Sequence, residues 1–236
     1  MPARRIESPP RFSGFRREAL RFLRENRERN SRSWVEEHKP DYQELLLEPF
    51  QLLVAELTKD MLKIDPRFET RPAVDRTISR VRRDTRFSPD KSLYRERMWL
   101  SFKQPRSDWT GHPAFYFEIN PEGCRYGLGY YEASPATMDR FRREIDRAPA
   151  AFRRAIAPLR KDGRFILAGE MYKRPKPSVH GPELEEWYQR KSFYLVRNRG
   201  VDRVLLSADL SEELRSGFRA LAPLYRYLLA LEGKAV

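Results

Sequence analysis

The spacing of apolar residues changes twice along this chain, and that change limits the folds that it can adopt. Near the start, apolar residues recur every three or four positions, as on one face of a helix, at Phe15, Ala19, Phe22 and Leu23. The same spacing returns near the end, at Leu214, Phe218, Leu221, Leu224, Tyr225 and Leu228. Between these regions, short runs at 98–102, 115–119 and 124–131 have the composition of strands. Helices that flank a block of strands indicate an α+β fold rather than alternating βαβ units.

The predicted strands follow one another closely enough to form an antiparallel sheet from adjacent hairpins. Asn120-Pro121-Glu122-Gly123 has the composition of a turn between two of them. The segment 73–81 is also β-like, and the segments 164–171 and 193–196 are expected to add edge strands. The fold prediction is therefore a central antiparallel sheet flanked by N-terminal and C-terminal helices.

Local signals predict where several helices begin and end. Ser13 is a candidate cap for the first helix, and the stretch 26–30 is expected to break it. Pro49 lies inside the next helical pattern and must kink or restart that helix. Ser134-Pro135 has the order of a cap followed by a proline at the first helical position. Ser211 is expected to open the terminal helix.

The length of 236 residues suits one large domain. We see no repeat and no linker, so we expect a disordered lead at 1–12 and a single α+β domain at 13–236. Cys124 is the only cysteine, which excludes an intrachain disulfide and fits a reducing compartment. The start does not resemble a signal peptide, and no apolar run approaches the roughly 18 residues of a membrane span. The sequence therefore favours the cytoplasm, with no membrane partner.

The charge balance is strongly basic. Lys and Arg number 47 and Asp and Glu 34, which gives a net charge of +13. Such an excess attracts polyanions, whether nucleic acid, anionic lipid heads or phosphorylated small molecules. The basic residues are spread along the chain rather than gathered in one tail, as in an arginine-rich surface that has no such partner. Both interpretations stay open.

The segment 80–95 is the most distinctive part of the chain, because basic residues crowd around a turn. Its basic residues are Arg80, Arg82, Arg83, Arg86, Lys91 and Arg95. Asp84 and Asp90 are its aspartates, and Ser88-Pro89-Asp90 is a turn signature. Arginine makes planar, bidentate contacts with phosphate or carboxylate, and a turn supplies backbone N–H groups, so this loop is a candidate anion site between two antiparallel strands. The alternative is an Arg–Asp network that only fixes the connection.

The same segment reads R-x-x-R-D-x-R-F-S-x-D-K-x-x-Y and resembles the signature of the uncharacterised family catalogued as domain of unknown function 2461. The resemblance covers most of the chain. It includes the Phe15 helix, Trp34 and the 42–49 region upstream, and Phe115-Tyr116-Phe117 with Gly127 and Gly129 downstream. A block with Lys173-Arg174, Pro175, His180, Leu184 and Lys191-Ser192-Phe193 completes it. Members usually have proline and lysine where Leu93 and Arg95 stand, and phenylalanine where Val35 stands. The resemblance implies no activity.

A second basic group lies further on, at Lys173, Arg174, Lys176, His180 and Lys191. A loop of this composition is expected to close over the first motif and complete an anion pocket, unless it is only a solvated basic loop. Other signals are weak. Gly127-Leu128-Gly129 lacks the third glycine of a dinucleotide fingerprint, and the histidines have no paired spacing for zinc. We therefore predict no metal and no cofactor, and we expect Cys124 to be a core thiol.

The leading functional prediction is a pocket protein that binds a small anionic ligand, either as an enzyme or as a binding protein. Its ligand-binding residues would be Arg80, Arg83, Arg86, Lys91, Tyr94, Lys173 and Lys191. If there is catalysis, Asp84 or Asp90 is the expected general base and the arginines stabilise charge. The alternatives are a basic nucleic-acid-binding module and a non-catalytic scaffold with a structural ion-pair network. The sequence determines neither the ligand nor the oligomeric state.

Overall fold

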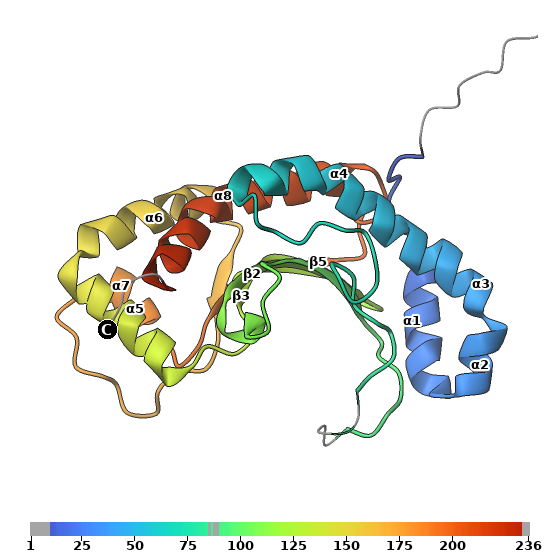
Figure 1. Ribbon diagram of the computed structural model, residues 1–236, viewed down its shortest axis with the longest axis horizontal. Helices are drawn as coiled ribbons and strands as arrows, with labels where there is room; N and C mark the ends of the chain where they lie inside the picture. Colours follow the sequence, from blue (N-terminus) through green and yellow to red (C-terminus); the bar gives the residue numbers. More distant parts are fainter. Residues whose placement is uncertain (1–9, 85, 87–89, 233–236) are drawn as a thin grey trace, which may run out of the picture.

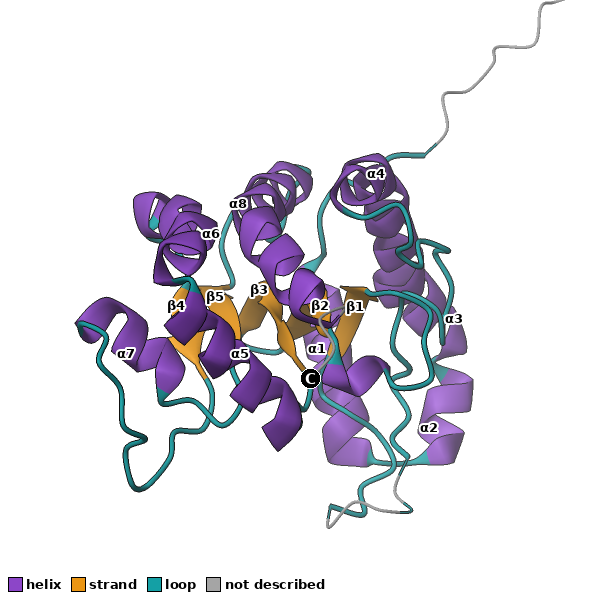
Figure 2. Ribbon diagram, turned by 60° about the vertical axis from the view of Figure 1, so that its left-hand side comes forward, coloured by secondary structure: helices purple, strands orange, loops and turns teal. Residues whose placement is uncertain are grey.

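A layer of helices covers one side of a curved sheet in the computed structural model, which describes residues 10–84, 86 and 90–232 (Figure 1). Helices α4 (Glu48–Ile64), α8 (Asp209–Glu232) and α6 (Pro149–Asp162) lie side by side on the convex side of the sheet (Figures 1 and 2). Among the described residues, no helix packs against the middle of the concave side (Figure 1). The sheet therefore has one face covered by helices and one face with no helix over its middle, called the open face below (Figure 1), although Glu118 and Val196 on it are buried.

The sheet has the order β1-β2-β3-β5-β4, and every neighbouring pair is antiparallel. Its strands are β1 (Met98–Phe102), β2 (Pro113–Asn120), β3 (Gly123–Tyr130), β4 (Ile166–Ala168) and β5 (Tyr194–Gly200). The predicted α+β fold with a central antiparallel sheet is confirmed. One detail is wrong, because β5 was expected at an edge and instead lies between β3 and β4.

The covered face of the sheet is apolar because alternate residues of each strand point to it. Leu100 pairs with Phe117, which pairs in turn with Tyr126, and all three are buried. Phe218 of α8 packs edge-on against Phe102, Phe115 and Tyr126 at ring-centroid distances of 5.3 to 6.5 Å. Cys124 is buried on the same face, as expected for a core thiol, and burial raises its pKa to about 12.

The N-terminal helices are α1 (Arg17–Arg29), α2 (Arg32–Glu37) and α3 (Lys39–Tyr42), followed by the π-helical turn Gln43–Leu47 and then α4. The expected break at 26–30 is wrong, since α1 runs through to Arg29 and ends at Asn30 in a left-handed conformation with φ 45°. Asn26 stays helical because its buried side chain donates to the Arg95 carbonyl at 2.8 Å. The packed chain also starts before Ser13, because Phe12 is buried and its N–H donates to Glu56.

Pro49 restarts the helix, as its chemistry requires. A proline inside a helix cannot donate to the residue four positions back, and its ring clashes with that carbonyl. The wider turn of Gln43–Leu47 comes directly before it, and Pro49 occupies the first turn of α4. The chain therefore continues in nearly the same direction without a steric clash.

The C-terminal half contains α5 (Pro135–Arg147), α6, α7 (Pro182–Tyr188) and α8. Ser134 caps α5 as predicted, and its hydroxyl accepts from the Thr137 N–H at 3.0 Å. The terminal helix begins at Asp209, two residues before the predicted Ser211. None of the helices in the described ranges is long and apolar enough to cross a bilayer.

The segment 73–81 is not a strand of the sheet, because it makes only isolated bridges. Ile78 pairs with Leu100 of β1, and Arg82 pairs with Tyr94 further along. The motif segment 80–95, called the motif loop below, thus folds back on itself and leads into β1. Its described residues contain no helix, so the predicted loop is confirmed there. Of the two antiparallel strands expected on either side of it, only β1, which follows the loop, is a strand of the sheet. Ser88 and Pro89 of the predicted turn lie outside the described residues.

Candidate anion site on the open sheet face

The open face carries polar and aromatic side chains in rows that cross the strands. These side chains alternate with the core residues, so directly paired positions share the face. One row is Trp99, Glu118, Arg125 and Asn198, the next is Ser101, Tyr116, Gly127 and Val196, and a third is Ala114, Gly129 and Tyr194. The face therefore combines aromatic rings, guanidinium groups and two glycines.

Glu118 is the carboxylate at the centre of the first row. Its side chain is only 9% exposed and pairs with Arg125 through two bonds, from Nε to Oε1 at 2.9 Å and from Nη2 to Oε2 at 3.1 Å. Arg97 approaches the same carboxylate at 3.9 Å from just before β1. One negative charge is thus shared by two guanidinium groups, which leaves this end of the face with a net positive charge.

Gly127 allows β3 and β5 to come unusually close at the middle of the face. A Cβ at this position would lie 1.8 Å from the Leu195 carbonyl oxygen. The Tyr116 ring lies beside that position, and its hydroxyl donates to the same carbonyl at 3.4 Å. Burial raises the pKa of Tyr116 above its ordinary value, so this hydroxyl is a neutral donor. The paired glycine and tyrosine give the face a fixed aromatic floor.

Arg95 joins the motif loop to the open face and has no carboxylate ion pair within the described residues. Its Nη1 donates to the carbonyl oxygens of Arg80 and Arg82 at 3.1 and 3.0 Å, and its guanidinium lies 4.9 Å from the Trp99 ring centroid. Burial lowers the pKa of Arg95 and the neighbouring charges of Arg83 and Arg97 lower it further, while Tyr131 and Asp84 offset part of this effect. The site thus holds a partly buried cation next to like charges, an arrangement that an anion would stabilise.

The motif residues predicted as ligand contacts are distributed along the loop beside this site. Arg83 pairs with Asp90 at 2.9 Å, and Arg27 of α1 approaches the same carboxylate at 3.3 Å. Arg80 pairs with Asp75, and Arg86 pairs with Asp84 at 2.7 Å. The pairs of Arg80 and Arg86 are largely exposed to solvent, whereas Arg83 is only 25% exposed. Lys91 is exposed and Tyr94 is buried. Of the predicted residues, Arg83 lies close enough to Arg95 for its charge to act on it, and Tyr94 belongs to the core.

Asn30 anchors the motif loop to the end of α1. Its Oδ1 accepts from the backbone N–H groups of Leu93 and Tyr94 at 2.6 and 3.3 Å. The left-handed backbone of Asn30 directs the side chain toward the loop, and asparagine tolerates this conformation better than most residues. The helix end and the loop are consequently held together by two backbone contacts.

We expect Asn30→Ala to lower the free energy of unfolding by about 2 kcal/mol, of which roughly half is backbone strain and half the lost acceptor. Asn30→Gly is the matched control, since it removes the acceptor and relieves the strain, and about 1 kcal/mol should be lost. Urea unfolding of the two variants checks this. Equal losses in both variants would show that the backbone conformation at Asn30 has no energetic role.

The second basic group lies at the other edge of the sheet, so the expected closure over the motif loop is wrong. The segment 169–191 follows β4 and precedes β5, whereas the motif loop precedes β1, and four strand-to-strand steps separate the two edges (Figure 1). Lys191 pairs with Glu170, and His180 pairs with Asp146 at 2.8 Å. Lys173 is exposed in the same segment. Both basic segments therefore flank the open face, and they do not form one pocket.

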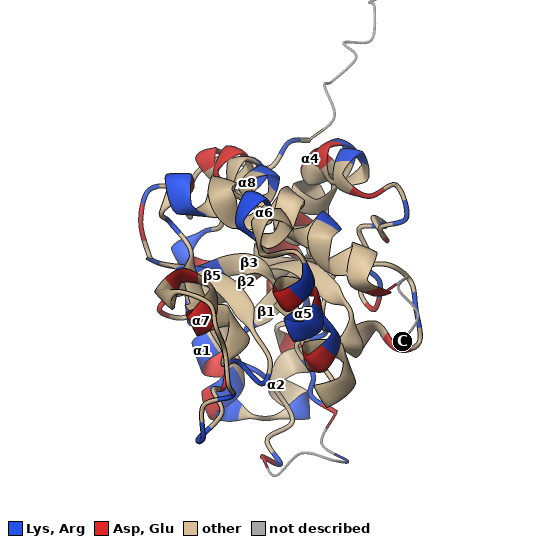
Figure 3. Cartoon of the chain, turned by 90° about the vertical axis from the view of Figure 1, so that its left-hand side faces the viewer, with Lys and Arg blue, Asp and Glu red and all other residues tan. Residues whose placement is uncertain are grey.

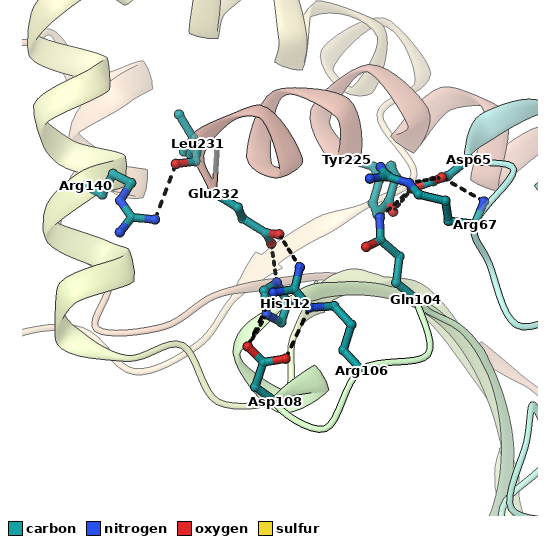
Figure 4. A network of polar contacts seen from close by, with 10 residues as sticks. All are labelled: Asp65, Arg67, Gln104, Arg106, Asp108, His112, Arg140, Tyr225, Leu231 and Glu232. Carbon is teal, nitrogen blue, oxygen red and sulfur yellow. Dashed lines mark hydrogen bonds and ion pairs between the residues drawn. The ribbon is translucent and has the colours of Figure 1, made fainter. Parts of the chain in front are cut away.

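A cavity of about 610 Å³ lies elsewhere, between α5, the end of α8 and the segment 106–112. His112 is held between Asp108 at 2.9 Å and Glu232 at 2.6 Å, and Arg106 contacts both carboxylates (Figure 4). His112 and then Arg106 lower the pKa of Asp108 to about 2. Cations and carboxylates offset one another here, so this cavity attracts an anion less than the open face does. No group of three or more metal-ligating His, Cys, Asp and Glu side chains occurs in the described residues.

Sequence reasoning did not identify Trp99, Glu118 and Arg125 as ligand-binding residues. It counted Arg95 among the basic residues of the motif but did not choose it as a ligand contact. The signal for them was present. Arg95, Arg97 and Trp99 occupy alternate positions leading into a predicted strand, as do Tyr116 and Glu118 in the next. Alternation places such residues on the face opposite the core. If the alternation had been followed through the polar positions of each strand as well as the apolar ones, these residues would have been predicted on the same face of the sheet.

Comparison with known proteins gives a family and no curated relative. The sequence profile of the family described as "Conserved hypothetical protein (DUF2461)" matches residues 18–227. No curated protein matches the chain. The matched range contains the motif loop, all five strands and most of the terminal helix.

Proposed function

Because the chain belongs to the DUF2461 family of conserved hypothetical proteins, whose description supplies no activity, we propose a function from its geometry. The protein binds an anionic, phosphate- or carboxylate-bearing ligand on the open face, at the arginines Arg83, Arg95 and Arg97. The observation that carries this proposal is the partly buried Arg95, which lies next to like charges. The class of ligand is the one that the sequence favours, but the site is on the sheet rather than in a pocket closed by the second basic group.

Electrostatics support an anion here more than a structural role for the arginines. Burying an uncompensated charge costs free energy, and that cost is offset when an opposite charge binds. A scaffold function would instead need buried, fully paired ions. The pairs of the motif loop are mostly exposed, and exposed pairs contribute little to stability. Arginine also offers the planar donors that match phosphate and carboxylate oxygens.

Binding is better supported than acid–base catalysis by the motif aspartates. The side-chain and backbone hydrogen bonds from Arg86 lower the pKa of Asp84 to about 2. The backbone N–H of Ser92 lowers the pKa of Asp90, and Arg27 and Arg83 lower it further. Carboxylates with lowered pKa values are weak bases at neutral pH. The two candidate general bases are therefore assigned to holding the arginines in place.

We expect phosphate and pyrophosphate to raise the melting temperature of the protein, and we expect Arg97→Ala to weaken this binding about tenfold. Arg97 is suitable because its side chain is 46% exposed and its nearest carboxylate is 3.9 Å away, so its removal should leave the fold intact. Thermal-shift titrations measure both effects.

Arg153→Ala on α6 is the matched control, with 48% side-chain exposure and a glutamate 3.7 Å away on the covered side of the sheet. The control should retain the wild-type response. If neither phosphate nor pyrophosphate stabilises the wild type, or if both variants respond alike, the proposed site is wrong.

A further inference from the structure

We propose that the open face is a binding platform for single-stranded nucleic acid. The proposal rests on the anion site above, which would hold one of several phosphates. Three independent features of the described residues lead to it: the extent of the open face, its aromatic rings, and a row of arginines on α1 that continues beyond the sheet.

The open face is much larger than a small anion needs. Five strands side by side extend about 19 Å, because neighbouring strands lie about 4.8 Å apart. Basic segments border both edges, since the motif loop leads into β1 and the segment 169–191 joins β4 to β5 (Figure 1). A phosphate or a metabolite would occupy one point of this surface, whereas a chain of nucleotides can cross it.

Aromatic and guanidinium planes on the face suit unpaired bases. Trp99, Tyr116 and Tyr194 belong to three different strands of the face. Arg95 lies over the Trp99 ring, so this position offers a stacked guanidinium as well as a ring. Proteins that bind single strands stack bases on such planes and guide the backbone with basic residues. Bases within a duplex are already stacked on each other, so these rings favour a single strand.

Helix α1 extends the positive surface past the end of the sheet. Arg17, Arg21 and Arg24 are spaced so that they share one side of the helix. Together with Glu18, Leu20, Pro121 and Val201 they line a cavity of about 430 Å³ where β2 turns into β3 and β5 ends. Glu18 pairs with Arg21 at 2.6 Å, so three arginines and one carboxylate line this cavity. Arg24 also approaches Glu122 of that turn at 3.9 Å. The arginines of α1 therefore lie at the end of the sheet where β2 turns into β3, and a strand that leaves the face at this end would bring its next phosphates to them.

The end of the molecule formed by α5 and α7 has a more balanced charge. On the side that Figure 3 shows, Lys and Arg are mixed with Asp and Glu along α5 and α7. On α6, Arg153 and Arg160 both pair with Glu183, at 3.7 and 2.7 Å. Generic attraction by the net charge of +13 would engage α6 as well as α1. A platform on the open face would depend on α1 but not on α6.

The test is fluorescence anisotropy with labelled oligothymidylate and oligouridylate about 12 nucleotides long, within the site sizes typical of single-strand binders. Binding is measured at physiological salt against a duplex of equal length and thymidine monophosphate. We expect the single strands to bind at least tenfold more tightly than either competitor. Equal or tighter binding of the duplex overturns the proposal.

Two charge-reversed variants locate the surface. Arg21→Glu with Arg24→Glu should weaken single-strand binding at least tenfold and reduce the slope of log K against log salt by about 1.4, since each lost phosphate contact accounts for about 0.7. Arg153→Glu with Arg160→Glu makes the same change of charge on α6 and should leave binding within twofold. Similar losses in both variants would show generic attraction and overturn the platform.

The outcomes also separate this proposal from the anion site. If phosphate stabilises the wild type and Arg97→Ala removes that effect, the anion site stands. If oligonucleotides then bind no better than the mononucleotide, the platform is wrong although the anion site remains. If phosphate gives no shift and oligonucleotides do not bind, both proposals fail.

Discussion

Replacing Asp65 with asparagine is expected to lower the free energy of unfolding by about 3 kcal/mol, since it disrupts a buried, charged hydrogen-bond network. Asp65 follows α4 and has a side chain that is only 3% exposed. Its oxygens accept from Arg67, from Gln104 Nε2 at 2.8 Å and from the Tyr225 hydroxyl at 2.7 Å (Figure 4). Asparagine has the same shape, but an NH2 group replaces one carboxylate oxygen. This NH2 group would face N–H and O–H groups that it cannot accept from.

The same residue predicts a dependence on pH. Hydrogen bonds from Arg67, Tyr225 and Gln104 outweigh the opposing effect of burial and hold the folded-state pKa of Asp65 well below its usual range. A group with a lowered folded pKa stabilises the fold above its unfolded pKa of about 3.9, and this contribution is lost as the pH falls further. Urea unfolding between neutral and acid pH should show a smaller loss of stability in Asp65→Asn than in the wild type.

Asp60→Asn is a suitable control for Asp65. Asp60 pairs with Arg215 at 2.7 Å on the same pair of helices, but its side chain is 26% exposed. Water can replace the lost interactions there, so we expect a loss of no more than about 1 kcal/mol. If Asp65→Asn lowers the free energy of unfolding no more than Asp60→Asn does, burial does not make the hydrogen bonds of Asp65 more stabilising than an exposed ion pair.

Glu213→Gln is expected to have an effect of similar size, about 3 kcal/mol, because three arginines share this one carboxylate. Arg197, Arg199 and Arg164 approach Glu213 at 3.0, 3.4 and 3.5 Å. The Tyr126 hydroxyl donates to it at 2.7 Å. The cluster fastens α8 to β3, β5 and the start of β4, and a neutral glutamine would leave partly buried guanidinium groups without sufficient negative charge.

The neighbouring Glu212 provides the control for this change. Its side chain is 65% exposed and pairs with Arg215 within the same helix. Glu212→Gln should alter the free energy of unfolding by less than about 1 kcal/mol. Thermal and urea unfolding should be measured for Glu212→Gln and Glu213→Gln. The comparison sets a carboxylate that three arginines share against a neighbouring carboxylate that is exposed to solvent. Equal effects would refute the role assigned to Glu213.

Those parts of the fold that depend on local patterns were predictable from the sequence. The run 98–102 coincides with β1, since alternating apolar residues there have to face a core. The turn Asn120-Pro121-Glu122-Gly123 correctly joined β2 to β3, and Ser134 correctly marked the start of α5. In each case the interactions that determine the structure are made among a few residues that are neighbours in the sequence. The failed boundary at Asn26 was set by a tertiary contact, because its side chain donates to the Arg95 carbonyl. At the terminal helix the failure was local, because Ser207 rather than Ser211 accepts from the first N–H group of the helix.

The candidate site was only partly predictable, because it depends on which strands pair. The motif loop was correctly singled out as a connection rich in arginine, but its ion pairs depend on distant residues such as Arg27. The position of β5 between β3 and β4 decides that the two basic segments stand at opposite edges. Local composition contains no information on that order. The assignment of Lys173 and Lys191 to the same pocket as Arg83 therefore failed, whereas the preference for an anionic ligand remains a proposal.

The pairing of α4 with α8 also determines when this chain can fold during its synthesis. The hydrogen bond from Tyr225 to Asp65 joins residues 160 positions apart, and the covered face of β1 and β2 is buried in part by α8. A nascent chain that has emerged only as far as β5 would still expose that apolar face to water. Contacts so distant in sequence slow folding, and exposed apolar surface invites aggregation in the interval. On the ribosome, the core therefore cannot close until α8 has left the exit tunnel.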